Sequence, residues 1–124
     1  MGEQRNYVRR IVPFKEYFKD FKKTLPKDVL LKIYQVFMLI MTETVVPVKF
    51  LRRIEGTKDL YEIRVEYSSN IYRIFCCFDE GYLIILFNAF QKKTNKTPPE
   101  EIERAERIKN EYFAAKASLT NRRK

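Results

Sequence analysis

The sequence predicts an α+β domain with the element order β-α-α-β-β-β-α and an antiparallel sheet. Apolar residues recur every three or four positions between 13 and 43, and they alternate or run continuously between 60 and 90. The segment Thr97–Glu100 has the form of a capping box that opens a last helix. At 124 residues the chain is long enough for one domain, expected at 1–117, with a basic flexible tail at 118–124.

The first half of the chain is predicted to hold one short strand and two helices. Aromatic and β-branched residues favour a strand at Tyr7–Val12, and Pro13 suits the first turn of an amphipathic helix that ends near Leu25. Pro26 marks the break before a second helix, Lys27 to about Glu43, which is apolar around most of its circumference. We expect this helix to lie in the core; the alternative is that part of its apolar surface receives a partner chain.

The second half is predicted to form a three-stranded meander. Thr42–Lys58 is expected to be irregular, because Pro47 forbids a helix there. Leu60–Tyr67 alternates between apolar and polar residues, and a Ser-Ser-Asn turn leads into Ile71–Phe78. After an Asp-Glu-Gly turn, Tyr82–Phe90 is apolar on both faces, which is typical of an interior strand.

Composition excludes several classes of site. The chain contains no His, which removes His-ligated metals, the Ser-His-Asp triad and a His-pair ribonuclease. Cys76 and Cys77 are adjacent and would form a strained disulfide, so we expect a reducing compartment. The longest apolar run, Val36–Met41, is far shorter than the ~20 residues that span a bilayer, and residues 1–10 lack the apolar core of a signal peptide. We expect a cytoplasmic protein without cofactor, metal or membrane contact.

The charge balance favours a polyanionic partner. The formal net charge is +9, and the basic excess lies at the two ends of the chain. Such a charge creates a field that attracts nucleic acid. The alternative is that the Lys and Arg side chains only keep the surface soluble.

The predicted hairpin brings two arginines together. If the apolar residues of both strands face the helices, Glu62, Arg64 and Arg73 share the opposite face, provided that the turn has two residues. A three-residue loop would separate the arginines. Each arginine could also simply pair with a glutamate of the neighbouring strand.

A cluster of lysines follows the last predicted strand. Lys92, Lys93 and Lys96 lie on the loop before the last helix, where their ammonium groups could meet phosphates while Phe90 offers a ring to a base. A lysine-rich loop seen alone is more often only solvated charge. The combination with the arginines favours a single-stranded RNA site.

These segments resemble a known family. Leu60–Arg64, Tyr72–Phe75 and the run Phe90–Pro98, followed by Glu100-Glu101-Ile102, look like the HigB-type branch of the RelE/ParE toxin superfamily, including its phage-derived host-killing relatives. The resemblance spans about 13–113. It implies a RelE-like twisted antiparallel sheet covered by the two N-terminal helices, with the first strand beside the last.

The resemblance also implies a function. Such a protein is the toxin of a type II toxin–antitoxin system, an mRNA interferase that cleaves messenger RNA on the ribosome and is neutralised by a cognate helix-turn-helix antitoxin of the HigA type. A non-cleaving nucleic-acid-binding or gyrase-inhibiting ParE-like module and a scaffold without enzymatic activity are the alternatives.

Candidate residues for cleavage by the 2′-hydroxyl follow from the motif match and from the chemistry of each group. Arginine is always protonated, so Arg64 and Arg73 are expected to stabilise the phosphate rather than move protons. A lysine crowded by other cations can lose its proton more easily, which makes Lys92 or Lys93 a candidate proton shuttle. The remaining expected RNA contacts are Lys96, Phe90, Glu62 and Asn88.

Overall fold

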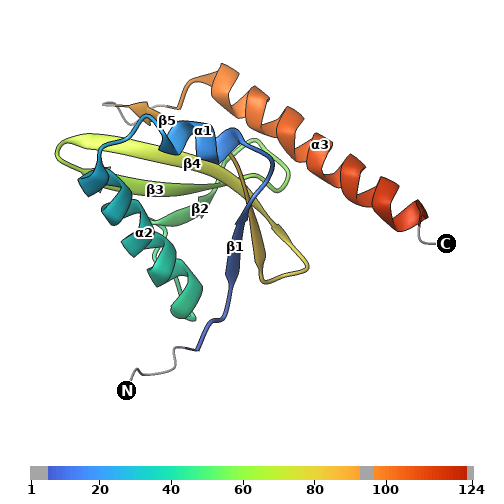
Figure 1. The fold of residues 1–124 in the computed structure, drawn as a ribbon, viewed down its shortest axis with the longest axis horizontal. Coiled ribbons are helices and arrows are strands. Elements are labelled where there is room, and N and C mark those ends of the chain that lie inside the picture. The colour runs from blue at the N-terminus through green and yellow to red at the C-terminus, as the bar shows by residue number, and fades with distance from the viewer. Residues whose placement is uncertain (1–5, 93–96, 123–124) are drawn as a thin grey trace.

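The protein is an α+β domain, as predicted. The computed structural model describes residues 6–92 and 97–122. Its elements are β1 (Arg10–Pro13), α1 (Tyr17–Lys22), α2 (Lys27–Thr42), β2 (Leu51–Arg53), β3 (Tyr61–Tyr67), β4 (Asn70–Asp79), β5 (Leu83–Lys92) and α3 (Pro99–Arg122). Figure 1 shows the sheet between α2 on one side and α3 on the other.

The five strands form one sheet in the order β1-β5-β4-β3-β2. The prediction that the first strand lies beside the last is confirmed, but this pair is parallel, with Ile11 opposite Ile84. The remaining neighbours are antiparallel. β5 therefore lies between β1 and β4 with both faces covered, which explains its apolar sequence.

The N-terminal elements are shorter than predicted. The strand occupies Arg10–Pro13 instead of Tyr7–Val12, and Pro13 ends it rather than opening a helix. Lys15 has a positive φ of 53°, which no helix tolerates, so α1 is a single six-residue segment that begins at Tyr17.

α2 covers one face of the sheet. Val29, Ile33, Val36, Phe37 and Ile40 are buried there against β3, β4 and β5, which confirms its role as a core helix. The opposite side of α2 stays exposed, as its exposed apolar side chains show: Leu31 and Tyr34.

A strand that the sequence did not predict forms the far edge of the sheet. β2 lies within the segment expected to be irregular and pairs with β3, placing Arg52 opposite Glu62. It has only three residues, too few to produce a readable alternation.

The β3–β4 hairpin has the register that the alternation predicts. Ser68 and Ser69 form a two-residue turn, and both have positive φ, at 50° and 65°. Arg64 is consequently opposite Arg73.

β5 contains a bulge opposite Phe75. Ile74 pairs with Ala89 but Cys76 pairs with Leu86, so Phe87 and Asn88 share one position. The bulge reverses the alternation of β5: Phe87 and Phe90 both belong to the core cluster on the α3 side.

α3 covers the other face of the sheet, where Ala105 and Ile108 pack on Phe75, Cys77 and Phe87. The helix starts at Pro99, and the carbonyl of Pro98 accepts the first backbone hydrogen bonds. In the described part of the chain Thr97 forms no capping bond with Glu100. α3 continues to Arg122, past Ser118, so it takes in most of the expected tail.

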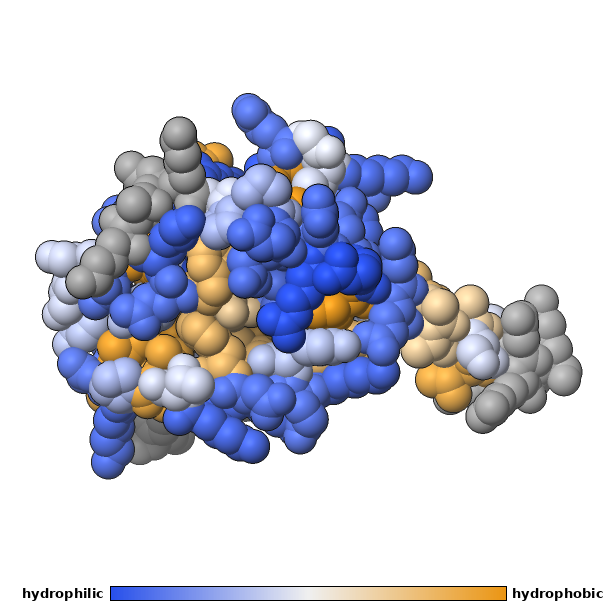
Figure 2. Space-filling view, turned by 90° about the horizontal axis from the view of Figure 1, so that it is seen from above, coloured by the Kyte–Doolittle hydropathy of each residue, from blue (hydrophilic) through white to orange (hydrophobic). Residues whose placement is uncertain are grey.

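The C-terminal part of α3 projects beyond the sheet (Figure 1). Figure 2 shows hydrophobic residues on this projecting end, next to the largely hydrophilic body. Among the residues that the structure describes, no helix combines the length and apolarity needed to cross a bilayer.

Candidate functional site

The strand register gathers most of the predicted site residues on the α3-facing side of the sheet. Arg64 pairs with Arg73, and Arg73 pairs with Phe90, so these three side chains form one row across β3, β4 and β5, here called the arginine row. In the next row Ile71 pairs with both Glu66 and Lys92. The other two predicted lysines, Lys93 and Lys96, lie outside the described residues.

The centre of the arginine row is a buried ion pair. Arg73 has no exposed surface and donates from Nη1 to Oε2 of Glu62, which is itself 1% exposed. The expected pairing of an arginine with a cross-strand glutamate is thus present. Arg73 and Glu62 are almost completely covered by the protein in this structure, although both were expected to act on the RNA directly.

A second arginine, Arg52, which was not among the predicted site residues, also pairs with Glu62. Nη2 of Arg52 lies 3.3 Å from the same Oε2 of Glu62, and the Arg52 side chain is 44% exposed. Glu62 therefore holds one buried and one accessible guanidinium. The only sequence signal was the basic pair Arg52-Arg53 within a segment expected to be irregular.

A hollow of about 380 Å³ opens beside the Glu62 pair. Its lining contains two guanidinium groups, those of Arg52 and Arg53, and two carboxylates, those of Glu55 and Glu62, so its formal charges balance. The residues that line it are Arg52, Arg53, Ile54, Glu55, Glu62 and Thr97.

Arg64 is the accessible end of the arginine row. Its side chain is 17% exposed, and Nη2 lies 2.8 Å from Oε1 of the exposed Glu66. Arg64 borders two hollows of about 500 and 190 Å³, the second of which also contains Lys32 and Lys49. A guanidinium in this position can reach a ligand that lies over the hairpin or over the edge of α2.

Phe90 and Lys92 are both half-buried at the end of β5. The ring of Phe90 stacks on Phe75 at 5.7 Å between centroids. One ring face is therefore occupied by the core.

Asn88 does not have the position expected of an RNA contact. It is 1% exposed, and its Nδ2 donates to the main-chain oxygen and to Oε1 of Glu101 in the first turn of α3. Asn88 thus fastens the start of α3 to the sheet, beside the arginine row.

Tyr72, the neighbour of Arg73 in β4, lies on the other face. It is 3% exposed within the core under α2, and burial raises its pKa. The parity of the hairpin predicted this placement.

A known protein family matches this chain over most of its length. Residues 19–110 match a family described as phage-derived protein Gp49-like. No curated protein is significantly similar in sequence.

The chain was matched with two solved structures. RelE in the archaeal RelE–RelB complex from Pyrococcus horikoshii OT3 superposes with a TM-score of 0.51 at 21% identity, covering 72% of this chain and 99% of that one. The RelB–RelE antitoxin–toxin complex from Methanococcus jannaschii gives a TM-score of 0.48 at 19% identity, covering 70% and 99%.

Proposed function

This chain belongs to the phage-derived Gp49-like family, and we propose that it is a RelE-superfamily toxin of a type II toxin–antitoxin system. We further propose that it cleaves messenger RNA on the ribosome as an endoribonuclease. The single observation that carries this proposal is the row of Arg64, Arg73 and Phe90 with Arg52 and Lys92 beside it. The accessible cations of this group, Arg64, Arg52 and Lys92, suit a phosphate that gains charge during cleavage.

The reaction that fits is attack by the RNA itself. The 2′-oxygen forms a bond to phosphorus while the bond from phosphorus to the 5′-oxygen breaks, leaving a 2′,3′-cyclic phosphate and a 5′-hydroxyl. One proton leaves the 2′-hydroxyl and one is taken up by the departing 5′-oxygen.

The accessible and buried cations receive different roles. Arg64 and Arg52 contact the phosphate, because their guanidinium groups are partly exposed and carry a fixed charge. Arg73 acts as a positioning residue that holds Glu62, and Glu62 in turn orients Arg52. Lys92 and Lys93 remain the proposed proton shuttles, and Lys96 a proposed RNA contact.

These groups alone supply weak acid–base catalysis. A well-placed general acid or base contributes about 10² to 10⁴ in rate, and the chain has no His to do so near neutral pH. Much of the acceleration must then come from holding the RNA in line for attack. We therefore propose that the ribosome orients the messenger RNA, which places the protein's action in the cytoplasm.

A cognate antitoxin is the proposed protein partner. The two similar structures are complexes of RelE with RelB, one of them described as antitoxin with toxin. For this chain we propose an antitoxin of the helix-turn-helix HigA type, in line with the motif resemblance.

Induced expression tests the toxin proposal. The native chain should arrest growth and create new 5′ ends within coding regions, whereas Arg64→Ala at equal protein level should do neither. The matched control is Lys27→Ala, an exposed lysine at the start of α2. Arrest with damaged DNA and intact messages would instead favour the gyrase-directed alternative.

A purified translation system tests ribosome dependence. Cleavage should require a translating ribosome and should leave 2′,3′-cyclic phosphate ends. Equally fast, selective cutting of naked RNA would refute the ribosomal part of the proposal and leave the nuclease part standing.

A further inference from the structure

β4 extends beyond its partner at one end. Tyr61, the first residue of β3, pairs with Cys76, so Cys77, Phe78 and Asp79 continue without a partner on that edge. On their other edge the same residues pair with β5. The end of β4 thus has one paired and one open side.

The direction of the backbone groups at this open edge follows from the hydrogen bonds of β3. The N–H of Arg64 donates to the carbonyl of Phe50, and the carbonyl of Leu60 accepts from the N–H of Ile54. The backbone N–H and C=O groups of the even-numbered residues of β3 therefore point toward β2. Its odd-numbered residues must then bond to β4, and in β4 they meet the even-numbered residues, the last being Cys76. Phe78 is the next residue of that series.

The hydrogen bonds between β5 and β1 lead to the same conclusion about Phe78. Tyr82 and Leu86 accept hydrogen bonds from β1 and its extension, so the even-numbered residues of this part of β5 face β1. Ile84, opposite Phe78, therefore turns its polar groups away from β4. The N–H and C=O of Phe78 point to the open edge, and in the described chain no backbone group of another segment bonds to them.

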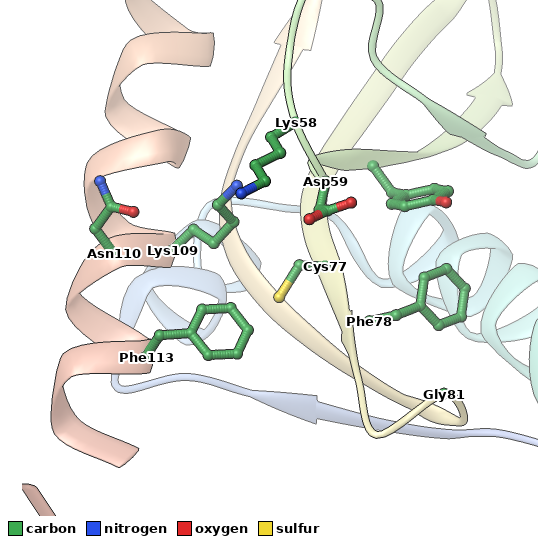
Figure 3. A pocket seen from close by; sticks show the side chains of 9 residues that line it. Lys58, Asp59, Cys77, Phe78, Gly81, Lys109, Asn110 and Phe113 are labelled. Carbon is green, nitrogen blue, oxygen red and sulfur yellow. The ribbon is translucent and has the colours of Figure 1, made fainter. Parts of the chain in front are cut away.

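A hollow of about 610 Å³ lies along this edge and is here called the edge groove. Figure 3 shows side chains on both sides of the strand: Lys109 and Phe113 from α3 on one side, and Phe78 on the other. The residues that line it are Lys58, Asp59, Tyr61, Cys77, Phe78, Gly81, Lys109, Asn110 and Phe113.

The two sides of the groove differ in chemistry. On the α3 side Lys58 and Lys109 point toward one another (Figure 3), with Phe113 39% exposed nearby. On the α2 side the rings of Tyr61 and Phe78 meet edge-to-face at 4.9 Å. The lining carries two ammonium groups and one carboxylate, that of Asp59.

We propose that the edge groove binds an extended, acidic segment of a partner protein, which adds as a strand to β4 through the N–H and C=O of Phe78. Successive side chains of a strand point to opposite faces. Acidic residues at every second position meet Lys58 and Lys109, and the apolar residues between them meet Tyr61 and Phe78. Main-chain bonds hold such a peptide, and alternate side chains select it.

The chain's charge supports an acidic occupant. Its formal net charge is +9, so an acidic segment is attracted over distance as well as at the groove. The two lysines come from separate elements, the β2–β3 connection and α3. Lys109 is 9% exposed and already pairs with Glu106 at 3.2 Å, so the exposed Lys58 offers the more accessible charge to an anionic side chain. The inference concerns a surface away from the arginine row and stands whether or not the protein cleaves RNA.

Amide hydrogen exchange of the full chain tests the open edge. In the free protein the amide of Phe78 should exchange freely, while those of Cys77 and Asp79 are protected by β5. A probe peptide of alternating glutamate and valine, acetylated and amidated at its ends, should slow Phe78 by about tenfold or more when it saturates. A Phe78 amide as protected as Cys77 in the free protein, or unchanged by the bound peptide, would overturn the proposal.

Charge and backbone variants separate strand addition from general attraction. Lys58→Glu should weaken binding of the probe about fivefold, whereas the same reversal at Lys27 should leave it within twofold. A lysine–valine peptide should not bind. N-methylation along one edge of the probe should abolish binding and along the other should not; equal effects on both edges would exclude strand addition.

Discussion

The two ends of β4 are built differently. At Arg73 the strand is paired on both edges, and its charged side chain is buried in an ion pair with Glu62. At Phe78 one edge is open; of the two lysines beside it, Lys58 is exposed and Lys109 is buried in an ion pair with Glu106. At the first end the charged side chains are buried and fixed in ion pairs. At the second end the N–H and C=O of Phe78 are available to bond a further strand. A fixed electrostatic site and an exchangeable binding edge can therefore share one strand.

The largest loss of stability should come from breaking the buried ion pair between Arg73 and Glu62. Arg73→Met leaves the buried Glu62 with only the half-exposed Arg52 beside it among the ion pairs described above, and should lower the free energy of unfolding by about 3–5 kcal/mol. Urea unfolding monitored by circular dichroism measures it. The double variant Arg73→Met with Glu62→Leu should recover most of the loss, because no uncompensated charge then remains.

A loss below about 1 kcal/mol in the single variant would mean that Glu62 reaches water or another cation when Arg73 is removed. The pair would then be a surface feature, and the contrast with the open end of β4 would disappear. For the same reason Arg73 variants are poor tests of toxicity, since a fall in folded protein also abolishes arrest.

The alternation of β3 and β4 predicts which face of the sheet Arg64, Arg73 and Glu62 occupy. It does not predict how deeply each side chain is buried. The alternation of Leu60–Tyr67 with a two-residue turn correctly placed Arg64 and Arg73 on one face; that Ser68 and Ser69 form this turn makes the two residues direct neighbours. Depth depends on what covers the face. The start of α3 and the partner Arg52 come from segments whose placement the pattern of β3 does not encode.

The bulge in β5 could not be predicted either. Simple alternation from Phe87 would turn Phe90 toward α2, away from the arginines. The extra residue returns Phe90 to the α3 side, but nothing in the apolar run 83–90 marks it. Likewise, the apolar spacing around Phe14 and Tyr17 was compatible with a helix, and only the positive φ of Lys15 divides it.

An intermediate effect is expected at the open end of β4. Asp79 is 7% exposed and accepts hydrogen bonds from Tyr112 at 2.6 Å and from Lys116 at 2.7 Å, which hold α3 beside the edge groove. Asp79→Asn should lower the free energy of unfolding by about 1–3 kcal/mol. Chemical denaturation of both chains at pH 7 provides the comparison.

The pH dependence of that difference has a definite sign. Burial raises the pKa of Asp79, but the hydrogen bonds from Lys116 and Tyr112 outweigh it and leave the pKa below its ordinary value of 3.8. A carboxyl whose folded pKa is depressed stabilises fully above the unfolded value and loses this contribution as pH falls through the folded pKa. The gap between the native chain and Asp79→Asn should shrink below about pH 3.8; a gap that widens there would contradict the ion pair.

The smallest change in stability should be at the exposed end of the arginine row. Arg64 is 17% exposed and its partner Glu66 is 67% exposed, so water screens the pair, and Arg64→Ala should lower the free energy of unfolding by at most about 1 kcal/mol. Thermal unfolding of Arg64→Ala beside Arg73→Met gives the test, because the two residues are direct cross-strand neighbours. A loss as large as that of Arg73→Met would show that the whole row is buried structure, and a loss of toxicity on changing Arg64 could then no longer be assigned to phosphate contact.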